Sequence, residues 1–185
     1  IGMKSWMVPF FAAALVKQGE GLPSATAQGS MLTALLSIVG AIAMAFTGSI
    51  SDRYGRTLTA GSIMAIAGVC SFTIGWLIDS PLWLIIAVSM IYGITVVAES
   101  PVLTTAVTEL APPGRLGAAQ ASQSFMGNIT SLLAPVAFGA ILDMGIWGGW
   151  GLAFSSLGIG AILGVGLMLR LRYLPESLSL ARGRR

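Results

Sequence analysis

The sequence is poor in charge and lacks residue types on which common functional sites depend. Only 9% of its 185 residues are charged, whereas soluble domains carry roughly 25%. It has no histidine and one cysteine, Cys70, which excludes an internal disulfide and a cysteine–histidine metal site. It also lacks a nucleophile–base pair, a phosphate-binding loop and a nucleotide motif. These absences predict that the chain is not an enzyme and that it uses no metal or cofactor.

Long apolar runs take the place of charged surface, and 55% of the residues are hydrophobic. A helix that crosses about 30 Å of hydrocarbon needs roughly 20 apolar residues. The runs predict an all-α membrane protein with six transmembrane helices, at residues 1–16, 28–50, 58–78, 81–109, 118–142 and 150–171. We interpret the short first run as a helix whose earlier turns are missing, since the basic flank and cleavage site of a signal peptide are lacking. We expect one bundle over 1–171 and a cytoplasmic tail over 172–185.

The distribution of basic residues predicts which side of the membrane each loop faces. Eight of the ten lie on one side of the six-span arrangement, and only Lys4 and Lys17 do not. The eight are Arg53, Arg56, Arg115, Arg170, Arg172, Arg182, Arg184 and Arg185. Because lysine and arginine are enriched in cytoplasmic loops, that side and the C-terminus are predicted to be cytoplasmic, in a bacterial-type inner membrane. The net charge of +3 reflects this bias and does not indicate nucleic-acid binding.

One polar stretch, residues 48–57, interrupts the apolar sequence and is interpreted as a tight turn between the second and third spans. Its pattern, G-x-x-x-D-R-x-G-R, resembles the loop signature of the major facilitator superfamily of transporters. In that family the signature joins the second and third helices of each six-helix half. The resemblance therefore implies that the chain is one half of such a transporter. The short tail after the last span favours the C-terminal half over the N-terminal half.

In the family this loop is a conformational latch, and the resemblance assigns that role to Gly48, Asp52, Arg53, Gly55 and Arg56. An aspartate near a helix N-terminus is stabilised by about 0.3–1 kcal/mol. Arginines can bind carboxylates, and glycines permit a close helix approach or a positive φ. Thr57 departs from the family, where another basic residue is common, so one latch contact is expected to be weaker. The alternative is a solvated loop that serves only as a topology signal.

Glu99 is an acidic residue in the middle of the fourth apolar run. It lies ten residues before Glu109, which corresponds to a depth of about 15 Å along a helix. An ionisable group at that depth costs at least about 2.5 kcal/mol, so it should face a cavity or a partner. Ser89, Tyr92 and Thr95 recur with it at three- and four-residue intervals and form one polar stripe. Burial favours the protonated form of a carboxyl, so Glu99 is a candidate proton carrier, with Tyr92 and Thr95 beside it. A structural carboxyl bonded to neighbouring helices is the alternative.

Lys4 is the possible counterpart of Glu99 in the first span. If the outer boundary lies at residues 15–17, Lys4 lies about eleven residues below it and near the midplane. A cation at this position could pair with Glu99 or hold an anionic substrate. Snorkelling of the side chain to the cytoplasmic surface is the alternative.

The fifth span carries a faint resemblance to a motif of drug/proton antiporters. Gly127, Pro135 and Gly139 match part of that glycine–proline pattern, but Ala134 stands where a glycine is expected before the proline. Helix packing is the simpler interpretation of these small residues.

Together these features predict a secondary active transporter that moves a small-molecule substrate by alternating access and is coupled to protons, with Glu99 as the candidate proton carrier. The partners expected are the lipid bilayer and either the missing N-terminal six-helix half or a second copy of the chain. A non-transporting membrane receptor or assembly subunit with the same fold is the alternative. The sequence does not name the substrate.

Overall fold

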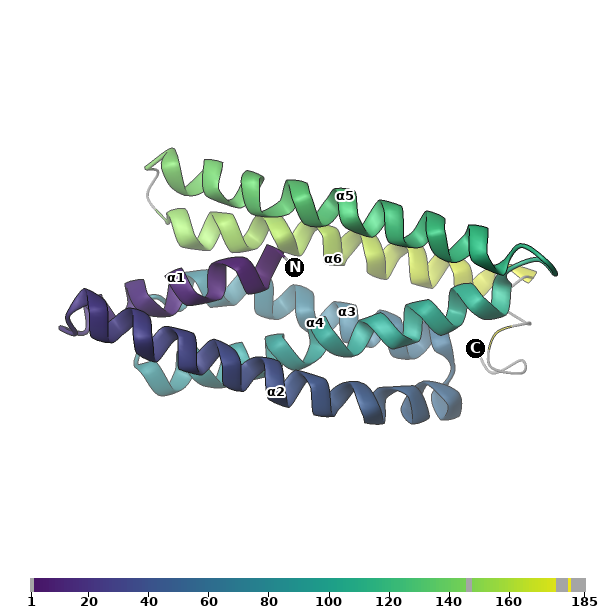
Figure 1. Cartoon of the computed structure of the whole chain (residues 1–185), viewed down its shortest axis with the longest axis horizontal. Coiled ribbons are helices and arrows are strands. Elements are labelled where there is room, and N and C mark those ends of the chain that lie inside the picture. Colours follow the sequence, from purple (N-terminus) through teal and green to yellow (C-terminus); the bar gives the residue numbers. More distant parts are fainter. Residues whose placement is uncertain (1, 146–147, 176–179, 181–185) are drawn as a thin grey trace.

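The computed structural model describes residues 2–145, 148–175 and 180, and in these ranges the chain is almost entirely helical. Six α-helices and one short 3-10 helix follow one another along the chain. They are α1 (Gly2–Lys17), α2 (Leu22–Tyr54), α3 (Arg56–Ile74), η1 (Gly75–Leu77), α4 (Leu82–Leu110), α5 (Leu116–Asp143) and α6 (Gly149–Tyr173). The α-helices lie side by side along one long axis (Figure 1). The all-α prediction is confirmed for these residues.

Five segments are long and apolar enough to cross a membrane: α2, α3 with η1, α4, α5 and α6. These five predicted spans are confirmed by length and composition. The first predicted span is a helix, but α1 has only 16 residues, fewer than the roughly 20 that a span needs. Figure 1 shows its N-terminal end near the middle of the bundle's length. Of the predicted tail, Arg172 and Tyr173 belong to α6, and residues 176–179 and 181–185, with Arg182, Arg184 and Arg185, lie outside the described residues.

The turn between α2 and α3 is shorter than the sequence predicts. Most of the polar stretch 48–57 is helical, because α2 continues to Tyr54 and α3 begins at Arg56. Gly55 alone reverses the chain, with φ 96° and ψ 148°. A side chain would strain a backbone with this positive φ, so glycine is the residue that allows two long helices to meet at one position.

The helices form two layers. Figure 1 shows α1, α2 and α5 nearer to the viewer and α3 and α6 behind them, while α4 begins behind α2 and comes forward along its length. The closest pairings are α3 with α6, α2 with α4, α3 with α4, and α1 with α2, whereas α5 packs mainly on α6. Phe138 is the one buried residue of α5, so this helix presents a long apolar surface to its surroundings.

An aromatic cluster of Trp6, Phe10, Phe138, Trp150 and Phe154 holds α1, α5 and α6 together. The ring centroids of Phe138 and Phe154 lie 4.9 Å apart at an interplanar angle of 87°, an edge-to-face arrangement that aromatic rings prefer. Phe10, Phe138 and Phe154 are completely buried. The cluster lies in the half of the bundle that contains the α5–α6 connection, so the other half of α5 is less closely packed.

Candidate functional site

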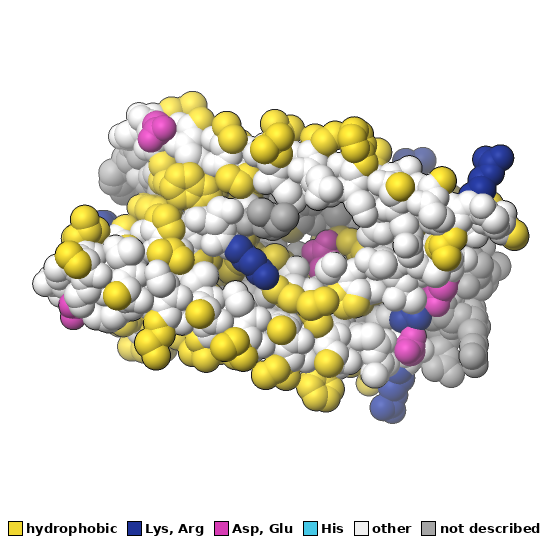
Figure 2. Space-filling model, in the orientation of Figure 1, with side chains coloured by type: hydrophobic (Ala, Val, Ile, Leu, Met, Phe, Trp, Pro, Cys, Tyr) yellow, Lys and Arg dark blue, Asp and Glu magenta, His cyan; other side chains and the backbone are white. Residues whose placement is uncertain are grey.

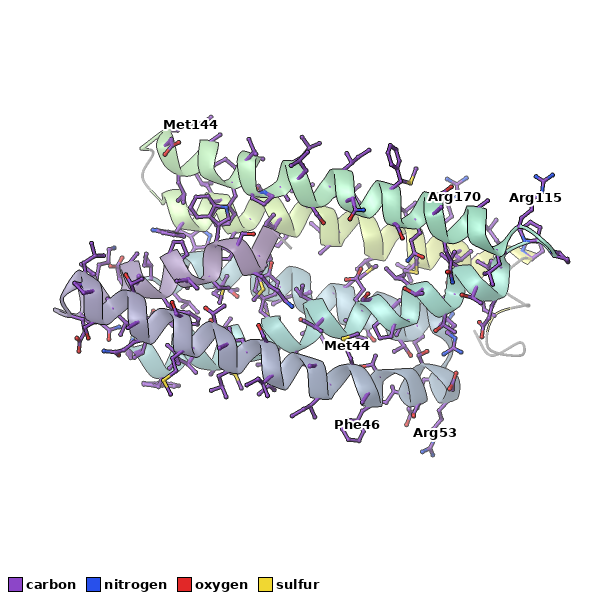
Figure 3. All side chains as sticks on the ribbon, viewed as in Figure 1. Met44, Phe46, Arg53, Arg115, Met144 and Arg170 are labelled. Atoms are coloured by element: carbon purple, nitrogen blue, oxygen red, sulfur yellow. The ribbon has the colours of Figure 1, made fainter. Side chains whose placement is uncertain are left out.

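Charged side chains gather at the two ends of the bundle, with two exceptions among the residues that the structure describes. Figure 2 shows blue and magenta side chains at both ends of the drawn face and, near its middle, one of each kind beside a hollow. Arg53, Arg115 and Arg170 mark one end in Figure 3, and Met144 marks the other. We call the first the arginine end. The candidate sites therefore lie in two places, at the arginine end and in the middle of the bundle.

At the arginine end, the buried Arg56 side chain is the centre of a charge cluster, which we define as Ser51, Asp52, Arg56 and Glu109. The Arg56 side chain is 8% exposed, and its Nη2 lies 2.5 Å from Asp52 Oδ1 and 3.0 Å from Glu109 Oε1. Its Nε donates to Glu109 Oε2 at 3.4 Å, and Nη1 donates to Ser51 Oγ. A guanidinium that binds both oxygens of a carboxylate is a strong and directional contact. The charge cluster thus joins the ends of α2, α3 and α4.

Asp52 lies in the last turn of α2, four residues before α3 begins at Arg56, and its stabilisation by a helix N-terminus stays a prediction. The carbonyl groups at a helix C-terminus carry partial negative charge, so an aspartate there is unfavourable by itself. The ion pair with Arg56, four residues later, compensates for this position.

Arg53 and Gly48 do not belong to the charge cluster. The Arg53 side chain is exposed, and its guanidinium carbon lies 5.6 Å from the centroid of the Tyr54 ring. It extends away from the bundle in Figure 3. A Cβ added at Gly48 would meet no atom within 4 Å, so the described part of this chain makes no close approach there. A latch contact at Gly48 stays a prediction that requires another surface.

In the middle of α4, Glu99 lines a cavity of about 170 Å³ between α3, α4 and α6, which we call the Glu99 cavity. Ser71 and Tyr92 line the same cavity. The Tyr92 hydroxyl donates to Ser71 Oγ at 3.0 Å, and Ser71 donates to the carbonyl of Phe154 at 2.7 Å. Among the described residues, neither an ion pair nor a hydrogen bond reaches the Glu99 carboxyl. The structure therefore brings Tyr92 and Glu99 together, as the polar stripe predicts.

Thr95 is separated from this group. Its hydroxyl donates to the carbonyls of Ile91 and Tyr92 in its own helix, and it lines a different cavity of about 460 Å³ between α2, α3 and α4. Residues four apart on a helix differ by about 40° in direction, and α4 has neighbours on both sides. The prediction that Thr95 lies beside Glu99 is therefore not supported by the structure.

Lys4 is exposed in the first turn of α1 and borders a narrow crevice of about 10 Å³ with Thr33 and Ser37 of α2. On α4 the crevice is lined by Gly93 and Val97, whereas the Glu99 cavity is lined by Tyr92 and Val96. Lys4 and Glu99 thus line two different hollows, although both lie near the middle of the bundle. No ion pair joins them in the part of the chain that the structure describes.

Two residues of the antiporter-like pattern pack against α1. The indole nitrogen of Trp6 donates to the carbonyl of Pro135 at 3.1 Å, and a Cβ at Gly139 would lie 3.1 Å from Cζ2 of Trp6. A Cβ at Gly127 would meet nothing within 4 Å. These contacts support the helix-packing interpretation of Pro135 and Gly139.

A family model described as Major Facilitator Superfamily matches residues 2–184, nearly the entire chain. The chain belongs to the Major Facilitator Superfamily. No curated protein and no solved structure matches it. Members of this family are membrane transporters, so the match and the apolar helices identify this facilitator chain as a multi-pass membrane protein of a transporter family.

Sequence reasoning missed Glu109, which binds Arg56 more extensively than Asp52 does. The order of the helices along the chain could have identified this pair. The helices α3 and α4 are antiparallel neighbours joined by a short turn, so the start of one and the end of the other meet at the same end of the bundle. An arginine and a glutamate at those two positions are expected to pair. No comparable pattern pointed to Ser71 in the facilitator chain, because a single hydroxyl residue in an apolar run does not indicate which neighbour its side chain contacts.

Proposed function

We propose that this chain is one six-helix half of a secondary active transporter that moves a small solute by alternating access, and that Glu99 carries the coupling proton. The observation that carries the proposal is the position of Glu99 in a cavity at the middle of α4, without a partner among the described residues. Intramembrane ionisable groups that face a cavity are typical of transport pathways and proton relays.

A carboxyl in this environment is suited to bind and release a proton as its access to water changes. Its charged form costs at least about 2.5 kcal/mol at the centre of a bilayer, so the neutral form is favoured while the Glu99 cavity excludes water. When the bundles move and the cavity is hydrated, the charged form is solvated and the proton can leave. The hydroxyls of Ser71 and Tyr92 line the same cavity and supply polar groups beside the carboxyl.

We assign the latch role to the charge cluster at the arginine end, which lies in the cytoplasm in this proposal. Arg56 is buried between two carboxylates from α2 and α4. A conformational change that separates these groups would leave an uncompensated charge, which is strongly unfavourable in a buried site. The cluster therefore stabilises the access state in which it is formed.

Transport requires a second six-helix bundle, either the N-terminal half of a longer chain or a second copy. The long apolar surface of α5 supports this, because five of its large apolar residues are at least 60% exposed: Phe125, Met126, Leu132, Leu133 and Val136. In lipid such a surface can be covered by acyl chains or by the other bundle. The binding path of a facilitator lies between its two bundles, so one bundle alone is not expected to transport.

The experiment uses proteoliposomes that contain the chain together with its completing bundle. A radiolabelled panel of carboxylates, amino acids, sugars and organic cations is tested with and without a pH gradient. We expect a transported solute to accumulate under the gradient, and Glu99→Gln to abolish accumulation while exchange between equal pools persists. Glu20→Gln is the matched control, since Glu20 is exposed in the loop before α2. Accumulation by Glu99→Gln at the parental level would remove the proton-carrier role, and failure of every solute to move would favour a receptor or assembly subunit.

A further inference from the structure

Lys4 and Glu99 are the two charged residues that lie far from both ends of the bundle, among those that the structure describes. The others are in the loops or the end turns: Lys17, Glu20, Asp79 and Asp143 at one end, and Asp52, Arg53, Arg56, Glu109, Arg115, Arg170 and Arg172 at the arginine end. Lys4 lies thirteen residues from Lys17, or about 20 Å along α1. Since hydrocarbon is about 30 Å thick, Lys4 lies well inside the membrane.

The surroundings of Lys4 contain no compensating charge. The residues that share its crevice are Met3 and Met7 of α1, Thr33, Leu36 and Ser37 of α2, and Gly93 and Val97 of α4. None of them is acidic. The Ser37 hydroxyl donates to the Thr33 carbonyl at 3.0 Å, and the Thr33 hydroxyl donates to the Gly29 carbonyl at 2.8 Å. Both hydroxyl protons are thus used within α2, and Lys4 supplies the crevice's charged donor.

The contrast with Lys17 on the same helix shows what is missing. Lys17 Nζ lies 2.5 Å from Asp79 Oδ1 at the water-facing end of the bundle. Lys4 is in the less polar position, yet no carboxylate comes within ion-pair distance of it in the described part of the chain. A charged lysine in this setting is energetically unfavourable unless a group of opposite charge binds it during the transport cycle.

We propose that Lys4 is an anion-binding position and that the solute moved by this transporter is a small anion with a carboxylate or similar oxygen group. The proposal rests on the proposed function, since the anion would enter the path between the two bundles. Glu99 does not neutralise Lys4 in the described part of the chain, because the two residues line different hollows and no ion pair joins them. When Glu99 is neutral, Lys4 is the one uncompensated charge of the described interior, so binding of an anion restores neutrality there.

The test is equilibrium binding to the assembled transporter in lipid nanodiscs. The probes are radiolabelled benzoate, lactate, succinate and phosphate, with choline and tetraphenylphosphonium as cations. We expect at least one anion to bind, Lys4→Met to weaken it about 10- to 100-fold, and Lys4→Arg to retain most of the affinity. Lys17→Met is the matched control, which removes a lysine from the same helix and should leave anion binding unchanged. Lys4→Arg also keeps the test valid if Lys4→Met does not fold.

The outcomes separate this inference from the proposed function. If anions bind equally to the parental protein and to Lys4→Met, or if only cations or uncharged solutes bind, the anion assignment is overturned. If transport is driven by a pH gradient but the solute is indifferent to Lys4, the transporter stands and the anion site falls. If anion binding depends on Lys4 but no solute crosses the membrane, the site stands and the transport function falls.

Discussion

The coupling between Arg56 and Glu109 can be measured directly with a double-mutant cycle. The perturbations are Glu109→Gln and Arg56→Gln, separately and together. The Arg56 side chain is 8% exposed and that of Glu109 is 26% exposed, so their contact is largely desolvated. Removing one member of a fully buried pair costs about 3–5 kcal/mol. Because Glu109 is partly solvated and Asp52 remains as a second partner for Arg56, we expect Glu109→Gln to lower the free energy of unfolding by about 2 kcal/mol.

The assay is unfolding in mixed micelles, followed by helicity, for the parental chain and each variant. The double variant should cost less than the sum of the single changes, with a coupling energy of about 1–2 kcal/mol. Asp52→Asn should cost only about 0.5 kcal/mol, because the Asp52 side chain is 65% exposed. Arg53→Gln is the control, since its side chain is exposed and forms a ring contact in place of an ion pair. Equal losses for Arg53→Gln and Arg56→Gln, or additive single changes, would show that the stretch is only a topology signal.

Two further predictions concern backbone conformation and helix packing. Gly55→Ala should lower the free energy of unfolding by about 1–2 kcal/mol, because the φ of 96° disfavours a side chain. Gly48→Ala should leave the melting temperature unchanged, because a Cβ at this position would have no neighbour within 4 Å. Equal melting temperatures for the two variants would contradict the strained turn. Gly139→Val should separate α1 from α5 by a clash with Trp6, while Trp6→Phe should lose about 1 kcal/mol through the missing hydrogen bond to Pro135. Crosslinking of cysteines placed on α1 and α5 measures the separation, and unchanged crosslinking in Gly139→Val would refute the contact.

The sequence predicted the helices well because their signal is local. An apolar run of about twenty residues and a proline or glycine break between runs place five spans to within a few residues. The α2–α3 turn was misjudged for a related reason. Polar residues such as Ser51 and Asp52 are typical of loops, but at the end of a long helix they remain helical because Arg56 satisfies them.

The site was predictable only in part. Helical periodicity shows which residues share a face of their helix, but it does not show which neighbouring helix that face contacts. Periodicity places Tyr92, Thr95 and Glu99 on one stripe. The side chains nevertheless differ by a few tens of degrees in direction around the helix axis, and this spread decides which neighbouring helix each one faces. In the structure that spread sends Thr95 toward α2 and α3 and Glu99 toward α3 and α6. The same limit applies to Lys4, whose depth could be estimated from the sequence but whose distance from Glu99 depends on how α1 packs.

The contact of Trp6 with Pro135 has a consequence for the order in which the chain is assembled. The two residues are 129 positions apart, and ribosomes add roughly 5–20 residues per second. Pro135, whose carbonyl accepts the hydrogen bond from the Trp6 indole, is therefore synthesised on the order of ten seconds after Trp6. During that interval α2, α3 and α4 are made, but the aromatic cluster is incomplete because Phe138, Trp150 and Phe154 do not yet exist. The aromatic contacts of α1 are consequently completed late, when the last two helices arrive, although it is the first of the six to be made.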